Sequence, residues 1–568
     1  MRRIIAILLV ALISSAVFAR AQSSAPFVSP AICGKGTFLF MLGDNPAGRE
    51  TFEIKCLPGG GYSAAGHTEM KAPGVALDLN TTLEADKAGL PVSSTAKGTA
   101  NSMPFEQSVT IKDATAVVTT RAGTREVPFS KGTVLLGGNI FYMFQFALAP
   151  YDVARGGVQE IPVFPNITMR VERAGRDEIQ PALAAGGKVS FERYAVTVGL
   201  SGMTTWVDAM GRLSVIAVPA QGFYAVREEY KDYLAGIKAS IASRTASAPD
   251  YSAPAGAPFT AEEVSVPAKG LQLAGTLLLP KSGKRPLPAV ITITGSGQQD
   301  RDERLPLPGL EGYKPFRQIA ETLAANGIAV LRVDDRGAGK SGGRETLERA
   351  SSFDFADDLR AQVEYLRKRP EIDPGRIALV GHSEGGIIAP LVAASDPRIA
   401  AIVLMAGTAK PGTLVLADQL RDLLERDPTV SPELREQRLR EQQEIFKKAL
   451  EESDESKVPE AVRGLWMRKF LDYDPLTTIR KVKQPVLILQ GALDRQVTAE
   501  QAAMLEKALA ESGNKDVAVH VLPGLNHLFL PSKTGAFTEY STLGTDQLGE
   551  DLLKILSDWL QRKLKASK

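Results

Sequence analysis

The chain has 568 residues, of which 44% are hydrophobic and 23% are charged, and its formal net charge at pH 7 is +2. This composition excludes an intrinsically disordered or fibrous protein. The near-neutral charge argues against a nucleic-acid-binding protein, which needs a strong basic excess. Because a chain of this length is long for one hydrophobic core, we expect two domains.

The first 21 residues have the layout of a cleavable secretory signal. Arg2 and Arg3 precede an apolar run from Ile4 to Ile13, and small residues follow up to Ala19-Arg20-Ala21. A membrane anchor is the alternative, but the apolar run is short for crossing a bilayer. Cleavage before Gln22 would leave 64 basic and 65 acidic residues. We therefore expect a periplasmic or secreted protein with no membrane span after signal removal.

The two cysteines, Cys33 and Cys56, both lie in the part expected to be exported. In an oxidising compartment they would form a disulfide, which stabilises a fold by roughly 3 kcal/mol. Two free thiols are the alternative. Neither cysteine has a histidine close in sequence that would indicate a metal site or a nucleophile.

Residues 22–245 predict a mostly β domain of unknown role. Short runs alternate apolar and polar side chains, as half-buried antiparallel strands do, and Gly, Pro, Asn and Asp separate them. Its one histidine, His67, is expected on a strand or at the surface. The expected strands are Thr37–Leu42, Val109–Ile111, Ala116–Thr120, Ile167–Val171, Tyr194–Val198 and Leu213–Val218.

The end of this half predicts a helix from Glu228 to Ile241, and residues 246–258, rich in Ala, Ser and Pro, predict a linker.

From residue 259 strands alternate with helices, which is typical of βαβ units in a doubly wound, mostly parallel sheet. The run Leu271–Leu279 is expected to add an antiparallel strand. The expected buried strands are Ala289–Thr294, Ile328–Val333, Ile377–Val380, Ala401–Met405, Val486–Leu489 and Val517–Leu522. The expected helices are Phe316–Asn326, Phe353–Arg369, Glu384–Ala394, Ala499–Ser512 and Gln547–Lys563.

The alternation of strands and helices breaks between Met405 and Val486. Three amphipathic helices are expected there, at Leu414–Leu424, Glu433–Leu450 and Val458–Phe470. Ligands of open α/β sheets bind beyond the carboxyl ends of the strands. An insertion at about 408–482 would therefore form a helical lid over the site.

A G-x-S-x-G pattern follows the strand Ile377–Val380 directly, in Gly381-His382-Ser383-Glu384-Gly385-Gly386. Such a turn needs glycines because its serine has a strained backbone and neighbouring side chains would clash. The bare pattern is common, and Ser383 could instead be a helix N-cap. Its place between a strand and a helix predicts that Ser383 is a nucleophile.

A nucleophilic serine needs an imidazole as its base, and the imidazole needs a carboxylate. Three of the four histidines are excluded as the base by their position. His67 lies in the first domain, His382 lies beside the nucleophile and is expected to point elsewhere, and His520 lies within a strand. His527 follows the last strand, and Asp494 follows the strand before it. Taken singly, Asp494 could be a turn residue and His527 a solvated side chain. The order Ser, Asp, His predicts the catalytic triad Ser383, Asp494 and His527.

The tetrahedral intermediate of acyl transfer needs hydrogen-bond donors already in place for its oxyanion. We expect the backbone N–H of Glu384, at a helix N-terminus, to be one donor. The second would be the N–H of Ser296 or Gly297, in a loop that could also be a generic tight turn. The substrate pocket is expected to include Gln298 and, from the insertion, Trp466, Met467 and Phe470, although plain packing of a lid also explains the last three. No metal or organic cofactor is expected.

Five motifs of the second half occur together in one order. They are Gly-Ser-Gly-x-Gln-Asp-Arg-Asp-Glu at 295–303, Asp-Asp-Arg-Gly at 334–337, Gly-His-Ser-Glu-Gly-Gly at 381–386, Asp-Tyr-Asp-Pro at 472–475 and Gly-Leu-Asn-His-Leu-Phe at 524–529. In these motifs the chain resembles exported bacterial α/β-hydrolases of the dienelactone-hydrolase-like group, which includes cinnamoyl- and feruloyl-type serine carboxylesterases. The resemblance covers about 260–566 and implies hydrolysis of carboxylic esters under a helical lid. Dienelactone hydrolases have a cysteine where this chain has Ser383, so dienelactone is not an expected substrate.

We therefore expect a serine hydrolase that cleaves small-molecule esters through an acyl-enzyme. One alternative is a peptidase or thioesterase that uses the same triad, which the sequence does not separate from an esterase. An alternative of another class is that residues 22–245 form a binding module for a lipid, glycan or cell-wall polymer and carry the hydrolase as cargo. The sequence does not predict the oligomeric state.

Overall fold

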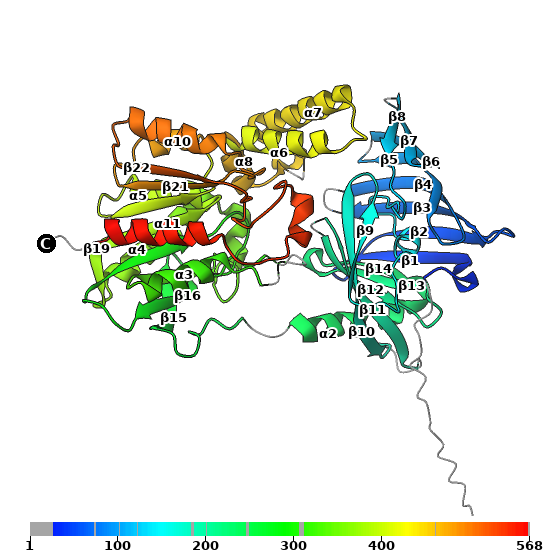
Figure 1. Cartoon of the computed structure of the whole chain (residues 1–568), viewed down its shortest axis with the longest axis horizontal. Helices are drawn as coiled ribbons and strands as arrows, with labels where there is room; N and C mark the ends of the chain where they lie inside the picture. Colours follow the sequence, from blue (N-terminus) through cyan, green and yellow to red (C-terminus); the bar gives the residue numbers. More distant parts are fainter. Residues whose placement is uncertain are drawn as a thin grey trace, which may run out of the picture.

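The computed structural model describes residues 27–72, 75–101, 103–121, 123–182, 187–199, 201–245, 249–305, 310, 312–459 and 462–565. The expected signal at 1–21 and residues 246–248 of the expected linker lie outside these ranges. The chain forms two bodies that lie side by side, each built on its own β-sheet (Figure 1). No helix of the described residues is long and apolar enough to span a membrane.

The first body is built on a sheet of fourteen strands, and the mostly β character predicted for this half is confirmed. The sheet order is β8-β7-β6-β5-β4-β3-β2-β1-β14-β13-β12-β11-β10-β9, and every pair is antiparallel. Pairing of β1 with β14 joins the beginning of this half to its end. The strands are β1 (Gly34–Leu42), β2 (Asn45–Cys56), β3 (Tyr62–Ala72), β4 (Val75–Ala85), β5 (Pro91–Ala100), β6 (Met103–Lys112), β7 (Thr115–Thr120), β8 (Gly123–Pro128), β9 (Val158–Val163), β10 (Ile167–Ile179), β11 (Val189–Val198), β12 (Ser201–Val207), β13 (Leu213–Val218) and β14 (Phe223–Arg227).

The core of the first body is filled by the connection between β8 and β9, which includes the short helix α1 (Phe144–Ala147). Almost every side chain from Ile140 to Leu148 is buried against both halves of the sheet. The buried carboxylate of Glu50 accepts the backbone N–H groups of Phe141 (3.0 Å) and Tyr142 (2.6 Å), which fixes this connection to β2.

A disulfide joins Cys33 to Cys56, with a Cα–Cα distance of 5.8 Å. It links the residue before β1 to the last residue of β2. The predicted disulfide is confirmed, and the alternative of two free thiols is wrong.

The second body is built on a sheet of eight strands in the order β15-β16-β18-β17-β19-β20-β21-β22. Its last six strands pair in parallel, and β15 and β16 add an antiparallel edge, so the predicted sheet is confirmed. Separate hydrophobic cores lie on the two faces, one under α4, α5 and α10 and the other under α3 and α11. The strands are β15 (Phe259–Ala268), β16 (Leu271–Pro280), β17 (Leu287–Ile293), β18 (Ala329–Val333), β19 (Ile372–His382), β20 (Ala401–Met405), β21 (Val486–Gly491) and β22 (Val517–Leu522). The helices are α3 (Pro315–Ala325), α4 (Ser352–Arg367), α5 (Gly385–Ala393), α10 (Glu500–Glu511) and α11 (Glu550–Lys563).

The segment between the bodies is more ordered than its composition predicts. The expected helix is present as a 3₁₀ turn, η3 (Glu228–Tyr233), followed by α2 (Leu234–Thr245). Beyond it, Tyr251 is buried, and the guanidinium of Arg301 lies 4.2 Å from the centre of its ring. Arg317 also donates to the carbonyl groups of Asp250 and Ser252. Residues 250–252 of the expected linker therefore pack against the second body.

A helical insertion lies between β20 and β21, as the break in alternation predicts. Its helices are α6 (Gly412–Arg426), α7 (Pro432–Glu451), α8 (Leu465–Asp472) and α9 (Pro475–Ile479). They share a small core that includes Phe446 and Leu471. Helix α8 begins later than the expected Val458, because Gly464, with φ of 102°, directly precedes it. In Figure 1, α6 and α7 lie along the top of the second body and extend toward the first.

Candidate active site

Ser383 occupies the tight turn between β19 and α5, as predicted. Its φ is +54°, a strained value for a residue with a side chain. A Cβ atom on Gly381 would lie 2.1 Å from the carbonyl oxygen of Gly385, and one on Gly385 would lie 2.3 Å from that of Ile293. The turn therefore requires glycine on both sides of the serine. Ser383 is half-buried, and its hydroxyl has no hydrogen bond to any residue that the structure describes.

His527 and Asp494 form a hydrogen-bonded pair, with 2.8 Å between Nδ1 and Oδ2. Both side chains are buried. Three further donors hold the carboxylate: Nε2 of Gln490 (2.9 Å), the N–H of Gln496 (2.8 Å) and the N–H of Val497 (2.9 Å). A carboxylate held in this way fixes the tautomer of the imidazole, with its proton on Nδ1 and a lone pair on Nε2. Nothing in the sequence pattern predicts the contribution of Gln490.

Ser383 and His527 line the same cavity, whose volume is about 340 Å³. No direct hydrogen bond between them is recorded for the described residues. Such contacts are often long without substrate and tighten in the Michaelis complex. Of the three residues that the sequence selects, Ser383 and His527 thus lie at one cavity, and Asp494 contacts His527 without lining it.

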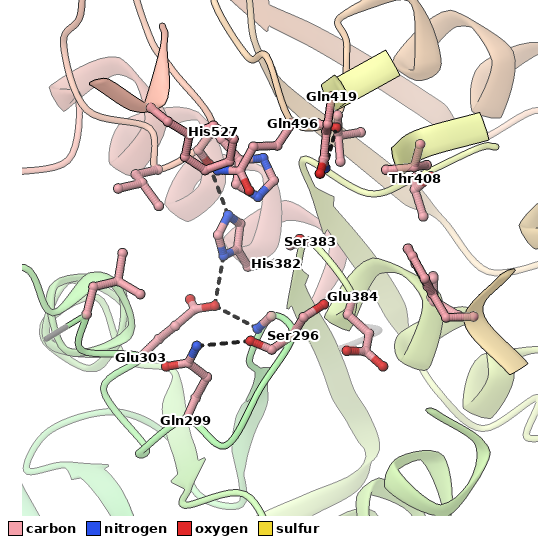
Figure 2. Close-up of a pocket in the computed structure, with 18 of the residues that line it drawn as sticks. Ser296, Gln299, Glu303, His382, Ser383, Glu384, Thr408, Gln419, Gln496 and His527 are labelled. Atoms are coloured by element: carbon pink, nitrogen blue, oxygen red, sulfur yellow. Dashed lines mark hydrogen bonds and ion pairs between the residues drawn. The ribbon is translucent and has the colours of Figure 1, made fainter. Parts of the chain in front are cut away.

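His382 lines the same cavity and lies between Glu303 and the backbone of His527 (Figure 2). Its Nε2 donates to the backbone carbonyl of His527 (3.0 Å), and its Nδ1 lies 2.8 Å from Oε1 of Glu303. The same oxygen of Glu303 accepts the N–H of Gly295 (2.7 Å). Burial favours neutral His382, but attraction and hydrogen bonding by Glu303 outweigh it and raise its pKa above 6.5. His382 is therefore a positioning residue, which the sequence alone does not reveal.

Two backbone N–H groups at the cavity are free to receive an oxyanion. Among the described residues, neither the N–H of Ser296 nor that of Glu384 has an acceptor, and both residues line the cavity with Ser383. The N–H of Gly297 also has no acceptor, but Gly297 lines a neighbouring pocket instead. Of the two predicted alternatives, the geometry therefore favours Ser296.

The side chain of Asp335 holds the loop that carries Ser296. This partly buried carboxyl group accepts hydrogen bonds from the hydroxyl of Thr294 and from the N–H of Gln299 (2.9 Å). Burial raises the pKa of Asp335 well above its usual range. A Cβ atom on Gly295 would lie 3.2 Å from Cβ of Ser383, so the loop packs directly on Ser383.

The insertion supplies one wall of the cavity. Trp466 and Phe470 from α8 stack on each other, with 5.4 Å between ring centres, and both line it. Further walls come from α6 and from the 3₁₀ turn η7 (Phe537–Thr542). Gln298 and Met467, also predicted for the pocket, do not line this cavity. Gln298 lies with Gly297 at the neighbouring pocket, and Met467 packs against the core of the insertion.

The charged residues 301–303 are buried beside the site and pair with other residues of the protein. Arg301 donates to both carboxylate oxygens of Asp334 at 3.0 Å, and Arg332 pairs with Asp302. These side chains are almost fully buried. Among the described residues, no group of three or more His, Cys, Asp or Glu side chains could hold a metal ion.

The sheet order, the helices on both faces and the turn at Ser383 are features of the α/β-hydrolase fold. Residues 309–533, less than half of the chain, match the family model described as serine aminopeptidase, S33. Esterase EstD of Thermotoga maritima is 28% identical over 308 residues, which cover 53% of this chain and 68% of that protein. The thiohydrolase apmlB of Arthrinium phaeospermum is 35% identical over 91 residues, which cover 16% of this chain and 28% of that protein.

Two solved structures also resemble the chain. The esterase PF2001 of Pyrococcus furiosus is 18% identical, with a TM-score of 0.37, over 56% of this chain and 96% of its own. Est1E of Butyrivibrio proteoclasticus with bound ferulic acid is 20% identical, with a TM-score of 0.36, over 53% of this chain and 99% of its own. Because both TM-scores are below 0.5, the fold assignment rests on the sheet and the turn themselves.

Proposed function

We propose that this protein is a serine hydrolase that cleaves carboxylic esters through a covalent acyl-enzyme. The observation that carries the proposal is the buried His527–Asp494 pair at the cavity that also holds the strained Ser383. The similarity to esterase EstD supports the ester as substrate.

In the first half of the reaction, Nε2 of His527 takes the proton of the Ser383 hydroxyl as Oγ bonds to the ester carbonyl carbon. The N–H groups of Ser296 and Glu384 hold the resulting oxyanion. When the bond to the alcohol breaks, His527 returns the proton to the leaving oxygen. In the second half, His527 deprotonates a water molecule as it attacks the acyl carbon, and His527 returns this proton to Oγ of Ser383 when the bond from Oγ to the acyl carbon breaks and the acid leaves.

An aminopeptidase is the competing function, since the matching family model carries that description. An aminopeptidase needs an unengaged carboxylate to bind the free ammonium group of its substrate. Among the described residues that line the cavity, the acidic ones are Glu303 and Glu384. Oε1 of Glu303 holds His382 and Gly295, and Oε1 of Glu384 holds Ser352 and Trp466, so neither carboxylate can turn toward an ammonium group without losing these contacts. This engagement favours the ester.

Hydrolysis of p-nitrophenyl acetate and of an aminoacyl p-nitroanilide by wild type and by Ser383→Ala tests the proposal. We expect wild type to prefer the ester and Ser383→Ala to lose about 10⁴-fold or more in kcat. A fluorophosphonate probe should label wild type at Ser383 and leave the variant unlabelled. Ester hydrolysis retained by Ser383→Ala would refute the assignment, and a preference for the anilide would favour the peptidase.

We also propose that α6–α9 act as a lid and that residues 1–21 direct export and are then removed. The wall that Trp466 and Phe470 form supports a lid. The Cys33–Cys56 disulfide supports an oxidising compartment. Cell fractionation and N-terminal sequencing of the purified protein test export, and a mature chain that still begins at Met1 in the cytoplasm would contradict it.

A further inference from the structure

A second cavity, also of about 340 Å³, lies between the two bodies. The first body contributes the turn between β9 and β10, residues Pro165–Thr168. The second body contributes α6, Arg495 and the segment around η7. Strand β10 contacts η7 directly, and Figure 1 shows this short helix between the two sheets.

The second cavity adjoins the one at Ser383. Gln419 of α6 and Phe537 of η7 line both cavities, so the two cavities share part of their walls. The volume of one such cavity is near the lower limit for ligand-binding sites. Two adjoining cavities together have room for an extended molecule. A ligand with its reacting group at Ser383 can therefore extend past Gln419 and Phe537 toward the first body.

The charged groups of the second cavity already have partners within the protein. Arg426 pairs with Asp422 at 2.8 Å, and Nε of Arg495 donates to the carbonyl of Thr534 (3.2 Å). The carboxylate of Glu539 accepts the N–H groups of residues 533–535. An ionic ligand would have to compete with these contacts, so the cavity favours an uncharged one.

Neutral polar and apolar side chains form the remaining surface of this cavity. Leu423 of α6 is 57% exposed although it is a large aliphatic residue, and Pro165, Ile167 and Phe537 lie around the same cavity. Apolar groups from both bodies that face one adjoining cavity are typical of a ligand-binding site.

We propose that this interdomain cavity is a second substrate subsite that takes the distal chain of an elongated, uncharged ester whose carbonyl lies at Ser383. The first body then completes the substrate site instead of acting only as a separate binding module. This inference rests on the proposed esterase function and adds the class of substrate.

The test uses matched variants in the full-length protein. Leu423→Asp places a charge in the subsite, and Leu414→Asp places one at a 52% exposed position of the same helix outside both cavities. Asn166→Trp fills the subsite from the β9–β10 turn, and Asn45→Trp makes the same change at an exposed position in the first body. None of these residues belongs to the proposed catalytic machinery.

The probes are p-nitrophenyl acetate against p-nitrophenyl decanoate, and ethyl acetate against decyl acetate. We expect Leu423→Asp and Asn166→Trp to lower kcat/KM roughly tenfold for the long probe of at least one pair. For the short probes, kcat/KM should stay within about twofold of the wild-type value. The control variants should behave as wild type. Equal effects on long and short probes, or no effect on either, would overturn the subsite while acetate hydrolysis still supports the esterase. Absence of hydrolysis in wild type would overturn both.

Discussion

The indole N–H of Trp466 donates a 2.8 Å hydrogen bond to Oε1 of Glu384, the residue that follows the proposed nucleophile. The same oxygen accepts the hydroxyl of Ser352 at 2.6 Å. The side chain of Glu384 thus holds the insertion helix α8, while its backbone N–H has no acceptor among the described residues. One residue therefore couples the position of the proposed lid to the proposed oxyanion hole.

Substitution Trp466→Phe tests this coupling. Phenylalanine retains an aromatic ring against Phe470 but removes the donor to the buried Glu384, and a hydrogen bond to a charged group contributes about 1.5–3 kcal/mol. We expect KM for p-nitrophenyl butyrate to rise roughly tenfold while fluorophosphonate labelling of Ser383 persists. Met467→Leu, the neighbouring residue outside the cavity, is the control and should leave KM unchanged. An unchanged KM in Trp466→Phe would show that this bond does not position the insertion.

The turn around Ser383 predicts a sharp difference between two glycines of one segment. In Gly385→Ala the new Cβ would lie 2.3 Å from a backbone oxygen, whereas in Gly375→Ala its nearest neighbour is Oδ1 of Asp373 at 3.6 Å. Overpacking that backbone cannot relieve costs about 1–3 kcal/mol. We expect Gly385→Ala to lower the urea midpoint and abolish ester hydrolysis, and Gly375→Ala to do neither. A stable, active Gly385→Ala protein would contradict this account of the turn.

The sequence predicts the parts of the site that depend on local pattern. The glycines around Ser383 and the ends of the last two strands are visible in the chain, and they select the serine, Asp494 and His527. The supporting contacts join residues far apart, such as His382 with Glu303 across 79 positions and Trp466 with Glu384 across 82. The local pattern of apolar and polar residues does not predict contacts between residues so far apart in the sequence.

In the first body, the sequence pattern likewise predicts some strands and not others. Strand β5 has no buried residue, yet it pairs with β4 on one side and β6 on the other. Backbone hydrogen bonds to its neighbours, not burial of an apolar face, give it its conformation. An apolar pattern therefore misses β5, although it finds β13, in which every side chain is buried.

The disulfide is expected to stabilise the first body. Its cysteines are 23 positions apart, and closing a loop of this size contributes about 3 kcal/mol through the unfolded chain. We expect the double variant Cys33→Ser/Cys56→Ser to unfold at a lower urea concentration, monitored by the fluorescence of Trp206, which is buried in this body. Dithiothreitol should destabilise wild type to a similar extent and leave the double variant unaffected. Equal midpoints for oxidised wild type and the variant would refute the prediction.

The buried pair of His382 and Glu303 predicts a pH-dependent contribution to stability. Attraction by Glu303 and, to a smaller extent, Asp494 overcomes burial and raises the pKa of His382 above 6.5 in the folded protein. The folded state then binds a proton that the unfolded state releases. The stabilisation is complete below about pH 6.5 and is lost as the pH rises through the raised pKa, with a slope of at most about 1.4 kcal/mol per pH unit.

Glu303→Gln removes the charge that holds this proton on His382 and keeps the size of the side chain. We expect the free energy of unfolding of wild type to exceed that of the variant most at pH 5–6, and the difference to shrink as the pH rises toward 9. Urea denaturation at each pH measures it. Glu321→Gln is the control because Glu321 pairs with Arg317 and not with a histidine, so its difference from wild type should stay constant. A difference for Glu303→Gln that is equally constant would show that His382 is not protonated through this pair.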